Sequence, residues 1–344
     1  MLETETQIST WQWQSWNGLP YLTCSLLQNW QHGFFTQQFY PNVPENLVEV
    51  LEPNAKVYRV KQVHGNRVLT PQEIEVEIRE QQLQESEDKF PPADGIVSNS
   101  SQQAIWVASA DCTPALIGDV QTGRVSAIHA GWRGTAQRII PNAIARFVEY
   151  GSILENLRLV MGPAIAGEVY QVSEQVAAEV GASFIPKEQA DTPEAILAVL
   201  QSMSQSPISE DPHPERVRLD VRRVNYLQLI GLGIRPEQIA IAPYCTYQQP
   251  EYFFSYRRTK QKQVQWSGIV SKGPKIVGIL QGRECPFFVE SRLKSACFTS
   301  NLLVLTQGCA TAIVSLPKSR LSLSLNVSPV VAINIHANFR CSAF

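Results

Sequence analysis

Apolar and polar positions alternate in short segments over residues 11–257, with periods typical of strands in some segments and of helices in others. Period-two or uniformly apolar runs bounded by Gly, Asn or Pro favour strands. They occur at 11–27 (a hairpin turning at Asn17-Gly18), 57–63, 105–110, 124–129, 157–161, 238–242 and 252–257. Helical periodicity behind a capping residue occurs at 135–150, after Ser173, after Thr192 and at 220–232. Because strands and helices interleave without a regular βαβ period, we predict an α+β (mixed α/β) fold.

Composition narrows the class of protein. The 344 residues are 44% hydrophobic and 17% charged, with a net charge of −2, which argues against disorder. No apolar run is long enough for a membrane helix, and MLETETQIST lacks the pattern of a secretory signal. The near-neutral charge gives no basic surface for nucleic acid. Seven Cys without disulfide-like spacing favour a reducing compartment, so we expect a cytoplasmic protein without nucleic-acid or membrane partners.

Charge and cysteine content change near Lys260. Residues 261–344 hold nine Lys and Arg against two Asp and Glu, whereas residues 1–260 hold 20 against 29. Four of the seven Cys also lie in this last part of the chain. We therefore predict a domain at 1–260, followed by an atypical basic extension at 261–344. The polar segment 73–90 is expected to be a surface excursion.

Three predicted strand ends carry the most informative side chains. KQVHGNRV, ADCTPALIGD and AIHAGWRGTAQRI place His64, Cys112 and His129 where a buried strand opens into a loop. Two His and one Cys with an open fourth position suit catalytic Zn²⁺, and the same trio suits a Cys–His nucleophile pair. Because the spacing matches no local metal motif, three incidental residues are the third interpretation. Arg133 and the amides of GWRGT could receive a phosphate, or form an ordinary turn.

Seven segments occur together and in order between about Gly33 and Arg258: KQVHG, ADG, ADC.P, HAGWRGT, GP.I....Y.V, LD....N...L and FFSYRR. On these segments the chain resembles the laccase-domain family, also called the YfiH-like or polyphenol oxidase family, whose members are described as purine nucleoside phosphorylases. The resemblance implies a layered α/β/β/α sandwich with mixed sheets. It also implies zinc held by His64, Cys112 and His129, which would be the catalytic residues. Nothing after Lys260 resembles the family, so the extension is expected to be non-native or poorly ordered, or else a small accessory domain.

The implied activity is phosphorolysis of adenosine, inosine and methylthioadenosine to base and ribose 1-phosphate, together with deamination of adenosine. Purine nucleosides and phosphate are then the partners. Arg133 is the candidate for phosphate binding, and Lys61 and Arg59 are weaker ones. Asp94 and Asp111 are candidates for protonating the purine. The sequence predicts neither the preferred nucleoside nor the oligomeric state.

Three other functions compete with this one. A cysteine hydrolase would use Cys112 with His64 or His129 as base and would work without metal. A copper-binding polyphenol oxidase would need copper and oxygen, but five His in the whole chain are too few for a mononuclear and a trinuclear centre. Copper therefore stays an alternative metal rather than the basis of a laccase. A binding module without catalysis is the third.

Overall fold

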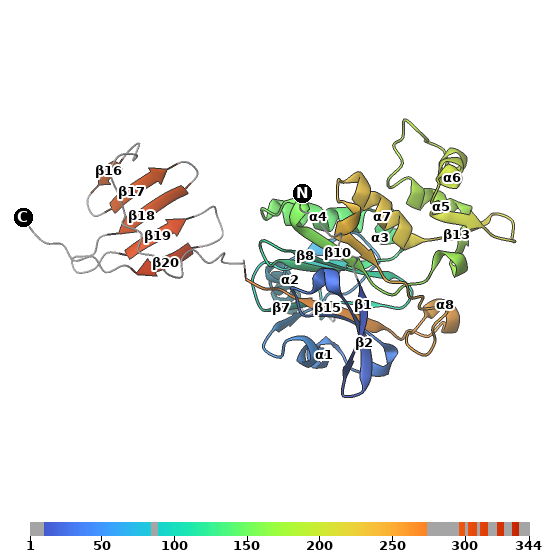
Figure 1. Ribbon diagram of the computed structural model, residues 1–344, viewed down its shortest axis with the longest axis horizontal. Helices are drawn as coiled ribbons and strands as arrows, with labels where there is room; N and C mark the ends of the chain where they lie inside the picture. Colours follow the sequence, from blue (N-terminus) through green and yellow to red (C-terminus); the bar gives the residue numbers. More distant parts are fainter. Residues whose placement is uncertain are drawn as a thin grey trace, which may run out of the picture. The chain divides into compact units, whose positions relative to one another are not determined.

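The computed structural model describes residues 10–83 and 89–273 and, within 296–336, the backbone of five strands. The chain divides into two compact units, Met1–Val277 and Gly278–Phe344 (Figure 1). The helices of the first unit are α1 (Pro44–Leu51), α2 (Pro71–Leu83), α3 (Trp132–Ala136), α4 (Ile139–Glu149), α5 (Glu174–Gly181), α6 (Pro193–Ser202), α7 (Val221–Gly231) and α8 (Tyr256–Thr259). No helix in these described ranges is long and apolar enough to cross a membrane.

Two six-stranded mixed sheets form the body of the first unit. The order of the first sheet is β1 (Trp11–Trp16), β2 (Leu19–Cys24), β3 (His32–Phe35), β15 (Gln265–Val270), β7 (Gln103–Ser109) and β4 (Lys56–Tyr58). The order of the second sheet is β14 (Ile239–Ile241), β10 (Leu157–Met161), β8 (Thr113–Asp119), β9 (Val125–Ala130), β6 (Gly95–Val97) and β5 (Val68–Leu69). Strands β8 and β9 are buried along their whole length, as is typical of strands covered on both faces.

The two sheets pack face to face. One core cluster joins Phe34, Ile105 and Ile269 of the first sheet to Leu116 and Val160 of the second. Burying a side chain of this size stabilises a fold by roughly 1.5–3 kcal/mol. This apolar layer therefore fixes how the ends of the two sheets lie against each other.

Helices cover the two outer faces (Figure 1). Leu47 of α1 packs with Trp106 and Val270 of the first sheet, and Phe147 of α4 packs with Ile128 of the second. Helix α7 joins the cluster of α4. The predicted mixed α/β class and the α/β/β/α layering are confirmed.

A smaller sheet lies beside this sandwich. Its strand order is β11 (Gln171–Ser173), β13 (Arg216–Leu219) and β12 (Ile208–Glu210), all antiparallel. Helices α5 and α6 pack with this sheet in a separate core cluster. Both helices begin at the predicted caps, because Ser173 and Thr192 accept hydrogen bonds from the backbone N–H three residues ahead.

Three predicted elements differ in the structure. The segment 73–90 begins as helix α2, because Thr70 and Glu73 form reciprocal capping hydrogen bonds. The predicted strand at 252–257 is wrong: Ser255 instead caps α8, by accepting from the N–H of Arg258 at 3.2 Å. The predicted helix at 135–150 is two helices, because Arg138 adopts a left-handed conformation between α3 and α4.

The first unit extends beyond the expected boundary at residue 260. Strand β15 lies between β3 and β7, pairing antiparallel with both. The division between the two units follows Val277. Trimming at Lys262 would therefore remove an interior strand of the first sheet, and a cut that respects the fold belongs after Val277.

The second unit contains an antiparallel meander. Its strands, in sheet order, are β16 (Ala296–Thr299), β17 (Leu302–Gln307), β18 (Ala310–Ser315), β19 (Ser322–Asn326) and β20 (Ala332–His336). The extension at 261–344 is predicted to be non-native or poorly ordered, or else a small accessory domain. Apart from residues 261–273 and the backbone of these five strands, this prediction concerns residues outside the described ranges.

A buried histidine in the first sheet predicts how stability depends on pH. Nε2 of His32 accepts from the N–H of Cys24 at 2.9 Å, and Nδ1 lies 2.9 Å from the carbonyl oxygen of Trp30. Protonation at Nε2 would place its N–H against the backbone N–H of Cys24, so that two donors would face each other. Burial accordingly lowers the pKa of His32 below its ordinary value of 6.5. The folded state therefore binds fewer protons than the unfolded chain below that pH.

We expect the free energy of unfolding to fall as the pH drops below about 6.5, by up to about 1.4 kcal/mol per pH unit for this one group. Urea unfolding followed by circular dichroism between about pH 7 and pH 5 measures this slope. In His32→Gln, which keeps one acceptor and one donor, the slope should be shallower by that amount. Equal slopes in both proteins would refute the assignment.

Candidate metal centre

Three side chains with metal-ligating atoms converge where the two large sheets meet. His64 lies in the loop after β4, Cys112 in the turn from β7 of the first sheet to β8 of the second, and His129 in β9. Their ligand atoms all lie within 4.8 Å of one another. The imidazole rings of the two histidines are nearly perpendicular, with centroids 4.8 Å apart. Residues that the sequence singles out at three separate strand ends thus form one cluster.

The buried carboxylate of Asp94 organises two members of this cluster. Its Oδ1 accepts from the backbone N–H of His64 and from Nδ1 of His129, both at 2.9 Å. Its Oδ2 accepts from the N–H of Val63 at 3.2 Å and of Gly65 at 2.7 Å. Because a carboxylate only accepts, His129 donates through Nδ1 and presents Nε2 to the cluster. Burial opposes ionisation, but His129 and the backbone N–H groups lower the pKa of Asp94.

The thiol and the imidazoles shift one another's protonation. Burial by itself would raise the pKa of the Cys112 thiol, but the charge and hydrogen bonds of His129, and then those of His64, lower it to about 6. Burial likewise opposes protonation of His129, yet the Cys112 thiolate and Asp94 raise its pKa to about 9. The cluster therefore stabilises Cys112 as a thiolate, the form that both binds metal and acts as a nucleophile.

Two residues beside the thiol have left-handed backbone conformations: His64 with φ +61° and Asp111 with φ +89°. Such conformations cost roughly 1–3 kcal/mol and persist only when their surroundings hold them. Asp111 is held through its side chain, which accepts from the hydroxyl of Thr246 at 2.7 Å and from the N–H of Arg257 at 2.6 Å. These contacts connect FFSYRR to the turn that carries Cys112.

A glycine lets the chain after His129 pass against the thiol. A Cβ at Gly131 would lie 2.8 Å from Sγ of Cys112 and 3.4 Å from the ring of His64. Such a separation is too short for any other residue without moving the thiol. The first glycine of HAGWRGT, Gly131, is therefore required by the packing of the cluster.

A small cavity of about 30 Å³ opens beside Cys112. Trp132, Ile165, Tyr170 and Val221 contribute to its wall. Burial, and then the charge of Cys112, raise the pKa of Tyr170 to about 12, against the opposing charges of Arg257 and Arg133. The phenol is therefore protonated at neutral pH and can donate a hydrogen bond.

The predicted binding residues fall into two groups. Arg133 and Lys61 are exposed, and the Arg133 guanidinium lies 4.5 Å from the centroid of the Trp132 ring. Asp94 and Asp111 are buried, and both oxygens of each carboxylate accept hydrogen bonds from the protein. This arrangement argues against either aspartate as a proton donor to a purine. Arg59 instead pairs with Glu45.

The donor set fits a metal ion of the zinc or copper class. A thiolate and two neutral imidazoles, one oriented through a carboxylate, are typical ligands of Zn²⁺ and of copper. Three protein ligands leave one tetrahedral position for a substrate or water. The chemistry of the side chains does not select between the two metals.

Comparison with known proteins decides the family. The family model described as multi-copper polyphenol oxidoreductase laccase matches residues 41–271. The chain belongs to this family. The chain is also 55% identical over 261 residues to purine nucleoside phosphorylase slr1573 of Synechocystis, covering 76% of this chain and 97% of that protein. The resemblance found in the seven segments is confirmed.

More distant relatives of the family carry two different names. Purine nucleoside phosphorylase YlmD of Bacillus subtilis is 29% identical over 58% of this chain and 65% of its own. Adenosine deaminase RL5, from an unknown prokaryotic organism, is 26% identical over 58% of this chain and 68% of its own.

Two solved structures share the fold of this chain. The YfiH protein of Bacillus licheniformis has a TM-score of 0.59 at 21% identity, over 73% of this chain and 96% of that one. YlmD of Geobacillus stearothermophilus has the same TM-score at 20% identity, over 76% and 98%.

Sequence reasoning named the three possible ligands but missed residues that shape the site. Trp132 lies in HAGWRGT, yet period and spacing do not show which side chains face a cavity. The sequence does indicate Tyr170 as a residue that could form the wall of a site for a planar ligand or belong to an ordinary loop, and it lines the cavity beside Cys112. The coupling of Asp111 to Thr246 joins positions far apart in the chain, so no local pattern could reveal it.

Proposed function

We propose that this chain is a purine nucleoside phosphorylase that converts adenosine, inosine or methylthioadenosine and phosphate to base and ribose 1-phosphate, and that it also deaminates adenosine. The observation that carries the proposal is the convergence of His64, Cys112 and His129 within 4.8 Å at the edge of an exposed loop. The names of the phosphorylase from Synechocystis and of the deaminase RL5 supply the two reaction classes.

We propose zinc as the metal, with copper as the alternative. His64, Cys112 and His129 would hold it, and the ion would supply a Lewis acid that polarises an oxygen atom at the open position. The Asp94 carboxylate would keep His129 in the tautomer that ligates. Removal of a resident metal should then abolish activity, whereas a hydrolase that uses Cys112 as its nucleophile should keep working.

The protein's own residues would bind and orient the reactants. In phosphorolysis a phosphate oxygen forms a bond to C1′ while the bond from C1′ to the purine nitrogen breaks, and its electron pair leaves with the base. The indole of Trp132 and the phenol of Tyr170 line the cavity beside the cluster and would exclude water from it. The exposed guanidinium of Arg133, whose charge acts on Tyr170 of this cavity, would attract the phosphate.

Phosphate dependence tests the proposed reaction. The metal-quantified protein is incubated with adenosine, with and without phosphate, and adenine, inosine and ribose 1-phosphate are measured. At early times, before inosine accumulates and is itself phosphorolysed, the proposal expects adenine and ribose 1-phosphate in equal amounts, formed only when phosphate is present, and inosine in both samples. Adenine with free ribose in the absence of phosphate would replace the phosphorylase with a hydrolase.

Arg133→Ala should raise the KM for phosphate by about tenfold or more, because a hydrogen bond to a charged group is worth roughly 1.5–3 kcal/mol. The kcat at saturating phosphate should change much less. Initial rates of ribose 1-phosphate release over a range of phosphate concentrations separate the two constants. Arg133→Lys keeps the positive charge but loses the planar guanidinium that can donate two hydrogen bonds at once. Its KM for phosphate should therefore lie between the values of the unsubstituted protein and of Arg133→Ala. An unchanged KM in Arg133→Ala would exclude this residue from phosphate binding.

A further inference from the structure

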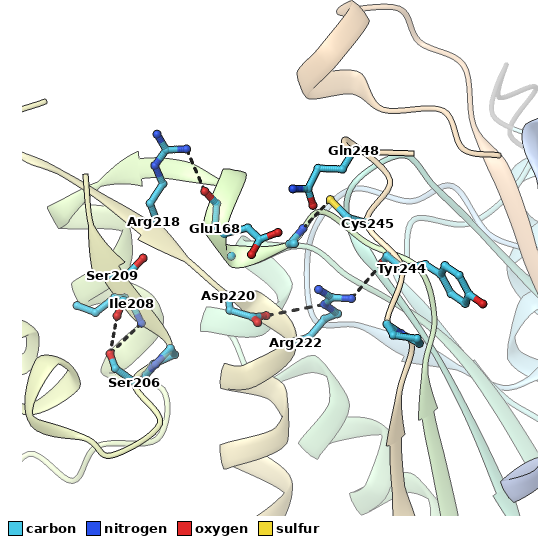
Figure 2. Close-up of a pocket in the computed structure, with 14 residues that line it drawn as sticks. Glu168, Ser206, Ile208, Ser209, Arg218, Asp220, Arg222, Tyr244, Cys245 and Gln248 are labelled. Atoms are coloured by element: carbon cyan, nitrogen blue, oxygen red, sulfur yellow. Dashed lines mark hydrogen bonds and ion pairs between the residues drawn. The ribbon is translucent and has the colours of Figure 1, made fainter. Parts of the chain in front are cut away.

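A second and larger cavity, of about 390 Å³, has none of the three cluster residues in its lining (Figure 2). One of its sides is the segment from Ser206 to Ser209, which leads into β12, and the other is the loop after β14 from Pro243 to Cys245. Its volume falls in the range of sites for small molecules. None of the predicted catalytic or binding residues lines it.

The two cavities share a wall. Ile165 and Tyr170 face the cavity beside Cys112, whereas Ala166, Gly167 and Glu168, which lie between them in the chain, face the larger one. The start of α7 divides in the same way: Val221 lines the cavity beside Cys112, whereas Asp220 and Arg222 line the larger one. The wall is tightly packed, since a Cβ on Gly167 would lie 2.7 Å from Cβ of Asp220.

A buried arginine in the lining of the larger cavity has one donor without a hydrogen-bond partner among the described residues. Arg222 is only 8% exposed, and its Nη1 donates to the carbonyl oxygens of Ala242 at 2.8 Å and Tyr244 at 3.1 Å. Its buried Nε–H makes no hydrogen bond to any described residue. A buried donor in this state is costly unless something else accepts from it.

A carboxylate that also lines the cavity lies just beyond hydrogen-bond reach of this donor. Oδ1 of Asp220 is 3.9 Å from Nε of Arg222, and Figure 2 shows the two groups pointing toward each other, joined by a dashed line. A hydroxyl group accepts at about 2.9 Å from nitrogen and donates at about 2.7 Å to oxygen. One hydroxyl placed between the two residues would satisfy both at that separation, because it accepts and donates at once.

The charges around this pair favour a neutral ligand. Arg218 also lines the cavity, but its guanidinium forms an ion pair with Asp211. Of the other charged residues in the lining, Asp220 and Glu168 carry two negative charges and Arg222 carries one positive charge. Bare anions are therefore repelled, whereas sugar hydroxyls can donate to the carboxylates and accept from the guanidinium.

We propose that this cavity binds a pentose through its hydroxyl groups, with one hydroxyl bridging Arg222 and Asp220. Free ribose and the ribose of a nucleoside present the same chemistry, and the volume accommodates either. This site is distinct from the cluster of His64, Cys112 and His129, and it does not depend on the proposed function.

The thiol of Cys245 locates binding, because it lines the larger cavity and is buried, with its Sγ accepting from the N–H of Ala166 at 3.2 Å. The full chain is treated with iodoacetamide in phosphate-free buffer, and modification of each Cys is mapped by mass spectrometry. Inosine, ribose and 2′,3′-dideoxyinosine are the probes, and calorimetry measures their affinities. Inosine can undergo neither proposed reaction under these conditions.

We expect inosine to slow modification of Cys245 and dideoxyinosine to bind there at least about tenfold more weakly, since it lacks the hydroxyl pair. Protection by ribose as strong as that by inosine would identify the free sugar as the ligand and support the proposal. Equal protection by inosine and dideoxyinosine would overturn it. Protection of Cys112 alone would also overturn it, because binding would then be confined to the metal centre.

Two variants test the pair directly. Asp220→Asn keeps the helix cap, since Asn caps as well as Asp, but loses the charged acceptor and should weaken protection of Cys245 severalfold. Arg222→Lys should weaken it by about tenfold or more, and Arg223→Lys, at the next position and outside the cavity lining, should have no effect. If Arg222→Lys does not fold, Ser209→Trp fills the cavity from an exposed position and should abolish protection. Unchanged protection in the folded variants would refute the site.

Discussion

Cys112→Ala is expected to abolish both metal binding and release of ribose 1-phosphate, with kcat/KM reduced by more than about a hundredfold. Loss of a partner that merely orients a ligand costs roughly 10- to 100-fold in affinity or activity, and loss of the thiolate itself should exceed that. The thiol is one of the three side-chain groups of the cluster that could hold a metal ion, and without it two imidazoles remain. Activity assays and metal analysis by mass spectrometry measure the two losses.

Cys24→Ala is the matched control for this variant. Cys24 is a buried free thiol in β2, packed into the core between the two sheets. Its removal should lower the free energy of unfolding slightly and leave bound metal and kcat/KM unchanged. If Cys112→Ala kept its metal but lost activity, Cys112 would be a nucleophile rather than a ligand, and the hydrolase would become the better explanation.

Asp94→Asn should reduce activity roughly 10- to 100-fold and destabilise the fold by about 3 kcal/mol or more. The carboxylate oxygens receive three backbone N–H groups and Nδ1 of His129. An amide would turn its NH₂ group toward some of these donors and leave them unsatisfied. Denaturant unfolding and metal analysis measure the two effects.

The pH dependence of this contribution has a definite sign. Because the folded pKa of Asp94 is lowered, its stabilisation is complete above the unfolded value of 3.8 and is lost only as the pH falls through the folded one. The destabilisation by Asp94→Asn should therefore be constant near neutral pH.

Asp119→Asn is the control for burial of a carboxylate. Asp119 is fully buried at the far end of β8, and its Oδ1 alone accepts two backbone N–H groups. The amide can keep that acceptor, so metal content should stay unchanged. Loss of metal in both variants would mean that Asp94 acts through stability alone.

The cluster of His64, Cys112 and His129 could be predicted because each member stands at the end of a predicted strand with a clear hydrophobic pattern. His64, Cys112 and His129 stand directly beside such runs, and the ordered segments around them identify the family. The role of Asp94 could not be predicted in this way. Its importance comes from backbone N–H groups of residues 63–65, which reach it only when β5 and β6 have paired.

Local pattern also misplaced the end of the first unit. The change in charge begins near Lys260, whereas Gln265–Val270 is a strand that pairs between β3 and β7. Charged residues lie mostly at exposed positions. The six residues of β15 carry no charge, so they do not change the net charge from which the boundary was predicted. The segment 252–257 has the composition of a strand, but the hydrogen bond from the N–H of Arg257 to Asp111 outweighs that preference.

The interior place of β15 has a consequence for synthesis of the protein. The strands on either side of it, β3 and β7, leave the ribosome much earlier and must wait for a partner. Until Gln265–Val270 emerges, the first sheet is open along a row of unpaired backbone groups, a state that invites association with other chains. Residues 278–344 lengthen the time between emergence of this strand and release of the chain. A nascent protein with this extension can therefore close its first sheet while still tethered.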